Sequence, residues 1–168
     1  MAAAERSPAE DLAFKRELVG LIPHLRAFAR TLTGDPTSAD DLAQDAMMKA
    51  WDARASYQMG TNMKAWTFMI LRNQFYSEKR RSWRQSQLDQ EAAERTLVAV
   101  DDPEAPVALD ELRLSLAALP AEQREALILV GAGGFAYEEA AEICGCAVGT
   151  VKSRVSRARK ALHAILED

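Results

Sequence analysis

Basic side chains are the residues of this 168-residue chain with the clearest capacity to bind another molecule, and they form two clusters. Between Lys64 and Arg84 there are six lysines and arginines and a single acidic residue, Glu78. Between Val148 and His163 there are five basic residues and no acidic one. The net charge of the chain is −4. Two basic clusters on an acidic protein predict local contact with nucleic acid, whereas a single cluster could simply complement a helix dipole.

The second cluster lies in a pattern typical of a helix-turn-helix. A short helix over 138–144 is predicted to end at Gly145, and the next helix has apolar residues at steps of three and four. Its other face is cationic and small-polar, which suits the base edges and phosphates of a major groove. An ordinary helical hairpin with a solvated face is the alternative, but such a face usually mixes charge signs. The expected inner residues are Val148, Val151, Val155, Ala158 and Leu162, and the expected DNA-binding residues are Thr150, Lys152, Ser153, Arg154, Ser156, Arg157, Arg159 and Lys160.

The first cluster alternates aromatic and cationic residues along a predicted helix over 62–83. Aromatic rings beside cations suit single-stranded nucleic acid, because unpaired bases stack on the rings while the cations neutralise the backbone. Aromatic residues at helical spacing are also typical of a core, to which we assign Phe68, Leu71 and Phe75. The neighbouring helix-turn-helix favours nucleic-acid binding for the others. These candidates are Lys64, Trp66, Arg72, Asn73, Tyr76, Lys79, Arg80 and Arg81.

Acidic residues recur at Asp40, Asp41 and Asp45 on a predicted helix, and three interpretations are open. Aspartates on a helix can hold magnesium for diphosphate chemistry, but such a site would need a second acidic motif, which the sequence lacks. Asp40 and Asp41 could instead complement the helix dipole in the first turn. The third interpretation is an exposed ridge that docks a basic partner helix, formed by Asp41, Asp45, Met48, Trp51 and Asp52. No pattern indicates a catalytic residue, a cofactor or a metal site, so we expect a protein that is not an enzyme.

The elements that must position these residues are helices. Apolar residues from Phe14 to Leu32 recur at steps of four and three, and Pro23 inside that pattern predicts a kink or a restart. A second helix is expected to run to about Arg54, with Thr37 or Ser38 as its N-cap. Its predicted buried face comprises Ala39, Leu42, Ala43, Ala46 and Ala50.

An acidic segment divides the helices into two groups. Residues 85–106 contain one basic residue, six acidic residues and two prolines, which indicates a linker, although Leu97, Val98 and Val100 could dock on a domain. No segment shows the alternation typical of a strand. The predicted fold is therefore all-α, with two small helical domains, 1–84 and 107–168, joined by a flexible linker. The second domain is expected to begin with a stripe of Leu109, Leu112, Leu116 and Leu119, followed by a helix over 121–130.

Composition also predicts the compartment. The sequence does not start with a cationic segment followed by an apolar stretch, and no apolar run is long enough to span a bilayer. Cys144 and Cys146 are one residue apart, too close for an ordinary structural disulfide. We expect a reduced, cytoplasmic protein.

Four motifs follow one another along the chain: residues 41–51 (DLAQDAMMKAW), 64–73 (KAWTFMILRN), 119–127 (LPAEQREAL) and the helix-turn-helix over 137–162. In this order they resemble the extracytoplasmic-function (ECF, group IV) sigma factors of bacterial RNA polymerase. Residues 131–150 look in particular like the EcfG type. That type serves the general stress response of alphaproteobacteria and is held by NepR-type anti-sigma factors.

The resemblance implies a role for each surface. It implies that residues 41–51 bind the coiled coil of the polymerase beta-prime clamp and that residues 64–84 melt and bind the minus-ten element. It also implies that the helix over 152–159 enters the major groove at the minus-thirty-five element, while the second domain rests on the beta flap. The polymerase-binding residues that it implies are Asp41, Leu42, Asp45, Met48 and Trp51.

Regulation by another protein is the remaining expectation. The resemblance predicts a promoter-recognition subunit that a NepR-like helical partner switches off by wedging between the two domains. PhyR-type anti-anti-sigma proteins carry a sigma-like domain ahead of a receiver domain, for which 168 residues leave no room. The alternative is a sigma-like interaction module or a stand-alone helix-turn-helix regulator that does not program polymerase.

Overall fold

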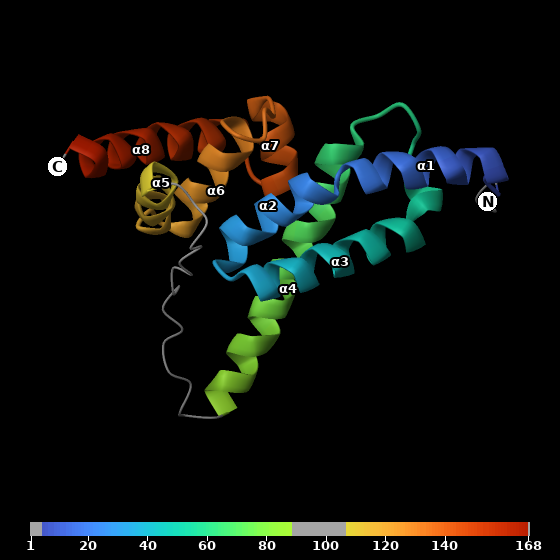
Figure 1. Cartoon of the computed structure of the whole chain (residues 1–168), viewed down its shortest axis with the longest axis horizontal. Helices are drawn as coiled ribbons and strands as arrows, with labels where there is room; N and C mark the ends of the chain where they lie inside the picture. The colour runs from blue at the N-terminus through green and yellow to red at the C-terminus, as the bar shows by residue number, and fades with distance from the viewer. Residues whose placement is uncertain (1–4, 89–106, 168) are drawn as a thin grey trace.

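The computed structural model describes residues 5–88 and 107–167, and every regular element among them is helical (Figure 1). The first part of the chain forms α1 (Pro8–Gly20), α2 (Ile22–Thr33), α3 (Pro36–Asp52), the short 3₁₀ helix η1 (Arg54–Ser56) and α4 (Met63–Leu88). The second part forms α5 (Val107–Ala117), α6 (Ala121–Val130), α7 (Tyr137–Cys144) and α8 (Val148–Glu167). The all-α prediction is confirmed. No helix in these two ranges is both long and apolar enough to cross a membrane.

The apolar stripe near the start of the chain forms two helices, as the position of Pro23 predicts. α1 ends where the Leu21 N–H donates to the Leu18 carbonyl at 3.0 Å, and α2 begins with Pro23 in its first turn. A proline is tolerated there because the first N–H groups of a helix have no partner within it. The buried residues of the stripe are Phe14, Leu18, Leu25, Phe28 and Leu32.

The start of α3 differs from the prediction. Asp35, and not Thr37 or Ser38, is the N-cap: its carboxylate accepts bonds from the Ser38 hydroxyl at 2.7 Å and the Ser38 N–H at 3.0 Å. These bonds lower the pKa of Asp35. A proline directly after the cap also favours this earlier start. Asp40 and Asp41 consequently lie beyond the first turn, so the predicted first-turn role for them is wrong.

The boundaries of the two long helices of the first domain also differ from expectation. α3 ends at Asp52, and its buried face is the predicted set of Leu42 and four alanines. α4 extends to Leu88, so residues 85–88 are helical and do not belong to the linker. The rest of the predicted linker, with Leu97, Val98 and Val100, lies outside the described residues.

The second domain contains the predicted helix-turn-helix. α6 has the predicted bounds, and α7 ends at Gly145, whose φ of +65° is the left-handed conformation that favours glycine. On the inner face of α8, Val151, Val155 and Ala158 are buried. Val148 and Leu162, at the two ends of that face, are half-buried.

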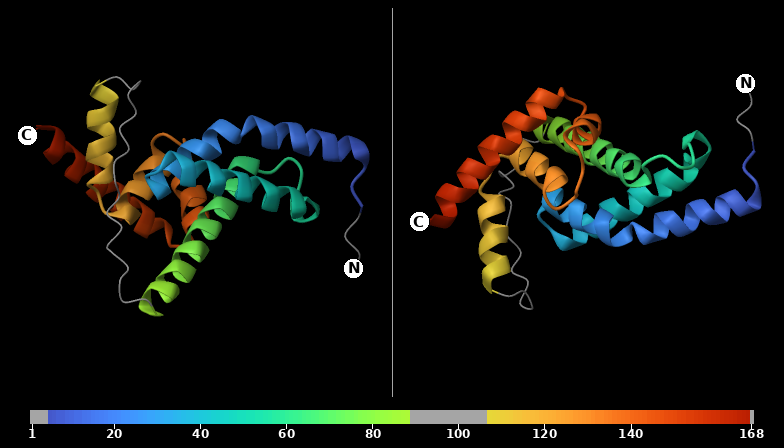
Figure 2. Two further views of the ribbon diagram at one scale, coloured as in Figure 1. Left: turned by 60° about the horizontal axis from the view of Figure 1, so that its bottom comes forward. Right: turned by 90° about the horizontal axis from the view of Figure 1, so that it is seen from above.

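The leucine stripe of α5 is less buried than predicted. Leu119, just after α5, is buried and Leu116 is half-buried, but Leu112 is exposed. α5 packs against α6 and α8 at the edge of the molecule, so α6 and α8 cover only one side of α5 (Figure 2). The side chain of Leu109 lies outside the described part.

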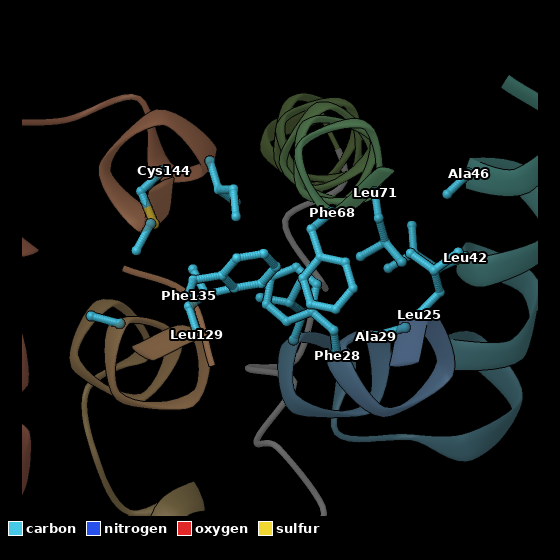
Figure 3. Close-up of a cluster of buried hydrophobic side chains, with 14 of the residues drawn as sticks. Leu25, Phe28, Ala29, Leu42, Ala46, Phe68, Leu71, Leu129, Phe135 and Cys144 are labelled. Atoms are coloured by element: carbon cyan, nitrogen blue, oxygen red, sulfur yellow. The ribbon is translucent and has the colours of Figure 1, made fainter. Parts of the chain in front are cut away.

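The two domains share one hydrophobic core. α4 lies against α7, and α2 lies against α6 (Figure 1). Phe68 of α4 stacks on Phe28 of α2 with ring centroids 4.7 Å apart, and Phe135, in the turn before α7, meets Phe68 edge-on at 5.2 Å (Figure 3). Leu129 of α6 belongs to the same cluster. Periodicity along the chain predicts two domains and a tether but not this contact; we call this placement of the domains the closed arrangement.

Candidate nucleic-acid and polymerase interfaces

The outer face of α8, the second helix of the helix-turn-helix, is cationic. Its small serines allow close approach to a groove floor, while its cations can reach base edges and phosphates. The only acidic residue of α8 is Glu167, at its end. The structure gathers the predicted residues on one side of the helix, and DNA contact by them stays a prediction. The exposed ones are Lys152, Ser153, Ser156, Arg157, Arg159 and Lys160, and Thr150 is half-buried.

Arg154 differs from its neighbours on α8 because it packs against the start of α6. Its side chain is half-buried, with Nη2 3.4 Å from the Oε2 of Glu122. Nη1 donates to the Sγ of Cys146 at 3.9 Å. Sequence patterns give no sign of Glu122 or its neighbour Gln123 at this surface. Together with α8 they line an open hollow of about 400 Å³, formed by Pro120, Glu122, Gln123, Gly149, Thr150, Ser153, Arg154 and Arg157.

Three of the candidate residues on α4 face the second domain. The Arg72 Nε–H donates to the Oε1 of Glu125, and the Tyr76 hydroxyl donates to the Oε2 at 3.0 Å. The Lys64 ammonium donates to the carbonyl of Gly133 at 2.7 Å. In the closed arrangement these side chains join α4 to α6 and to the turn that follows it.

Glu125 is the centre of this interdomain contact and is not among the residues predicted from the sequence. Its side chain is 2% exposed, and the Cys144 Sγ donates to its Oε1 at 3.7 Å. Burial, with the Glu125 charge as a second cause, raises the pKa of the Cys144 thiol to about 12. The same two causes raise the pKa of Tyr76 to about 12. One signal was available: Glu125 precedes the buried Leu129 by four residues, which places a carboxylate on the apolar side of α6.

The C-terminal half of α4 has a different environment. This half extends away from the rest of the molecule (Figure 1). The predicted cations Lys79, Arg80 and Arg81 are exposed on it, as is Asn73 nearer the middle of the helix. Trp83, among these cations, is 63% exposed.

Trp66 is partly a core residue. It is half-buried, and its ring centroid lies 4.9 Å from that of Tyr57 and 6.0 Å from that of Phe14. The core assignments of Phe68 and Leu71 are confirmed, since both are buried, whereas Phe75 is half-buried.

The ridge predicted on α3 is exposed along most of its length. Asp41, Asp45 and Asp52 are exposed, and Met48, which lies one helical turn after Asp45 and one before Asp52, is 67% exposed. Trp51 is half-buried beneath the guanidinium of Arg54, which lies 4.2 Å from the ring centroid. An exposed methionine flanked by carboxylates suits a partner with both apolar and basic residues.

Leu42 does not belong to that ridge. Its side chain is 3% exposed and packs in the shared core, so its assignment to polymerase binding is wrong. The physical reason is helical spacing, because residues 39, 42, 43 and 46 lie on one side of α3, which faces the core.

The magnesium interpretation of the aspartates gains no support. The Asp40 Oδ1 lies 3.5 Å from the Arg26 Nε of α2, which gives this carboxylate a structural partner. Within 5–88 and 107–167 there is no group of three or more histidine, cysteine, aspartate or glutamate side chains that could hold a metal ion.

Comparison with known proteins places both domains in one family. Residues 20–85 match sigma-70 region 2, and residues 109–162 match sigma-70 region 4. The chain is 47% identical to the ECF RNA polymerase sigma factor EcfG of Rhodopseudomonas palustris over 150 residues, which is 89% of this chain and 83% of that protein. It is 34% identical to the ECF sigma factor SigC of Mycobacterium tuberculosis over 134 residues, 79% of this chain and 72% of that one.

Solved structures show the same similarity. The sigma factor RpoE of Bartonella quintana, in complex with the anti-sigma factor NepR, matches 92% of this chain and 97% of its own with a TM-score of 0.83 and 47% identity. CnrH, in complex with the cytosolic domain of CnrY, matches 99% of this chain and 92% of its own with a TM-score of 0.67 and 26% identity.

A region 2 domain and a region 4 domain with its helix-turn-helix define a sigma factor, the class of protein that binds core RNA polymerase and promoter DNA. The chain belongs to the ECF RNA polymerase sigma factor family and is similar within it to EcfG.

Proposed function

We propose that this chain directs bacterial RNA polymerase to the promoters of a general stress response. In this proposal Asp41, Asp45 and Met48 on α3 bind the beta-prime clamp, α4 binds the minus-ten element and α8 binds the minus-thirty-five element. One observation carries the proposal: a single chain presents an acidic and apolar ridge on α3 together with an acid-free cationic face on α8. A stand-alone DNA-binding regulator has no need of the ridge.

The two halves of α4 have different tasks in this proposal. The exposed cations Lys79, Arg80 and Arg81 neutralise phosphates, a contact that is independent of sequence. Lys64, Arg72 and Tyr76 lie nearer the body of the domain, where they contact unpaired bases. The first functional domain then extends through α4 to Leu88, and the second begins with α5.

In this proposal the chain recognises promoter DNA and is not itself an enzyme. It acts in the cytoplasm together with a polymerase that performs the catalysis. Apolar side chains on the second domain support docking on the beta flap. Leu112 and Leu114 on α5 and Ile165 and Leu166 at the end of α8 are all exposed. Exposed apolar groups of this kind are typical of a protein interface.

A NepR-like anti-sigma factor is the proposed inhibitor, since the similar RpoE was solved in complex with NepR. The direct contacts of α4 with α7 and of α2 with α6 leave no place for a wedge between the domains in the closed arrangement. We therefore replace the expected wedge with a partner that spans the outside of both domains. Such a partner gains affinity because its two contacts are linked through one chain.

Binding to core polymerase distinguishes this function from the alternative. Fluorescence anisotropy of labelled full-length protein, titrated with purified core enzyme, should show saturable binding. The complex, but not the isolated protein, should then retain promoter-length DNA at physiological salt. DNA binding of equal strength with and without core enzyme would instead support a stand-alone regulator.

A further inference from the structure

The hollow beside α8 has a second wall that comes from α6, and this wall carries a carboxylate, that of Glu122. On the α8 side the hollow is lined by a stripe of polar residues three or four positions apart, Thr150, Ser153, Arg154 and Arg157. Residues at this spacing share one side of a helix. DNA bound along the stripe would therefore lie beside the start of α6, where a carboxylate repels its phosphates.

The Glu122 carboxylate has a partner on α8. Its Oε2 lies 3.4 Å from the Nη2 of Arg154, while the Nη1 of Arg154 donates to the Sγ of Cys146 at 3.9 Å. Cys146 lies in the turn between α7 and α8. The guanidinium of Arg154 is thus held by α6 at one nitrogen and by the turn at the other, and its side chain is 23% exposed.

This ion pair contributes little to the stability of the fold. The Glu122 side chain is 68% exposed, and solvent screens the charges of such a pair. The pair does restrict Arg154. An arginine that is already held loses less conformational entropy when it binds. Its planar guanidinium also matches the edge of a base only in the correct orientation.

We propose that Glu122 is a positioning residue for DNA recognition, which holds the Arg154 guanidinium against α6 in an orientation that contacts one base edge of the minus-thirty-five element. This proposal rests on the proposed function of α8. Without Glu122, Arg154 is free to contact neighbouring phosphates, and phosphate contacts carry no sequence information. Preference at one base pair then depends on a residue of α6, outside the helix-turn-helix.

Positioning and simple electrostatics predict opposite effects for Glu122→Gln. Loss of a negative charge beside DNA tightens binding to every sequence alike. Loss of positioning instead weakens binding only to sequences with the preferred base. We therefore expect discrimination at one base pair to fall by about fivefold, while affinity for the other sequences does not fall.

Selection from a DNA pool measures this discrimination. Full-length protein is mixed at low salt with short duplexes that carry a randomised central segment, and the bound and free fractions are sequenced. The proteins compared are the parent, Glu122→Gln, Arg154→Met and the double variant. Both single variants should lose preference at the same base pair, and the double variant should lose no more than Arg154→Met.

Two controls separate positioning from charge and from folding. Glu138→Gln removes an exposed carboxylate from the first turn of α7, in the same domain, and should leave every base preference unchanged. Because Glu122 is exposed, Glu122→Gln should have a thermal midpoint close to that of the parent. If Arg154→Met loses its helical circular dichroism, Arg154→Lys replaces it, since lysine keeps the charge but lacks the planar fork.

Three results would overturn the proposal. Tighter binding of Glu122→Gln to all sequences, with unchanged preferences, would show that the carboxylate only repels phosphates. An equal effect of Glu122→Gln with and without Arg154 would show that it does not act through that arginine. Loss of the same preference in Glu138→Gln would show a general effect of charge. A parent protein that selects no sequence would overturn the proposed function of α8, and this inference with it.

Discussion

Arg72 and Glu125, 53 residues apart in the sequence, form an ion pair between the two domains with the carboxylate almost fully buried. Removing one partner of a buried pair leaves an uncompensated charge, whereas replacing both by apolar residues is often tolerated. We infer that the pair specifies how the domains are placed more than it adds to stability.

The first prediction follows from this asymmetry. Arg72→Met or Glu125→Leu alone should lower the free energy of unfolding by about 3 kcal/mol, and the double variant should recover most of the loss. Urea unfolding followed by circular dichroism measures all four proteins of the cycle. Additive losses in the double variant would show that the two side chains do not interact.

Alkaline pH should weaken the same interface. The pKa of Tyr76 and of the Cys144 thiol is raised to about 12 from ordinary values of 10.0 and 9.0, so unfolding favours loss of both protons. Their contribution is complete below about pH 9 and is lost as the pH rises from 9 to 12. The free energy of unfolding should fall less steeply over this range in Tyr76→Phe and Cys144→Ala than in the parent. Equal slopes in all three proteins would contradict the assignment.

On α8 we expect two kinds of DNA contact. Arg157 is exposed in the middle of the outer face, with Ser153 one turn before it, and is assigned to base edges. Arg157→Ala should cost about 1–3 kcal/mol of binding and relax preference at one position of the minus-thirty-five element. Lys152→Ala and Arg159→Ala should weaken all sequences alike and reduce the salt slope by about 1. Uniform weakening by Arg157→Ala across minus-thirty-five variants would show that it contacts phosphate.

Charge reversal on α3 tests the ridge. Asp45→Arg should weaken binding to core polymerase by about 100-fold or more, because a like charge then faces the basic clamp. Since Asp45 is exposed, the thermal midpoint should stay close to that of the parent. Glu17→Arg is a matched control, because Glu17 is exposed on α1 and is not a residue of the ridge. Normal binding by Asp45→Arg, or an equal loss in the control, would remove this residue from the interface.

Inhibitor binding should need both domains. With a purified NepR-type protein, Met48→Asp in the first domain and Leu114→Asp in the second should each weaken binding by about tenfold or more, since each places a charge on an exposed apolar contact. Full-length variants are preferable to separated domains, because the two domains share one core. Loss of affinity in only one of the two variants, or simultaneous binding of inhibitor and core polymerase, would contradict the spanning mode.

Local features of the fold could be predicted from the sequence, and non-local ones could not. Helical periodicity identified the buried faces of α3 and α8, and Gly145 marked the end of α7, because each depends on residues a few positions apart. The cap at Asp35 was missed because several capping residues compete within one turn. Leu42 was assigned to a surface by motif resemblance although its spacing already placed it with the core alanines.

The interdomain contact lay beyond such reasoning. Nothing in the local pattern around Arg72 or Lys64 distinguishes a cation that faces solvent from one that meets a carboxylate far along the chain. The one sequence feature that points to this contact is Glu125 on the apolar side of α6. A carboxylate there predicts a buried partner but does not identify which residue that partner is.

In vitro transcription on genomic DNA from the organism that encodes this chain tests the central claim most directly. Purified core polymerase is combined with the full-length protein, and the 5′ ends of the transcripts are sequenced. A sigma factor should give discrete start sites that share two upstream elements, one near minus ten and one near minus thirty-five, and Asp45→Arg should abolish them. Start sites that do not differ from those of core enzyme alone would contradict the account.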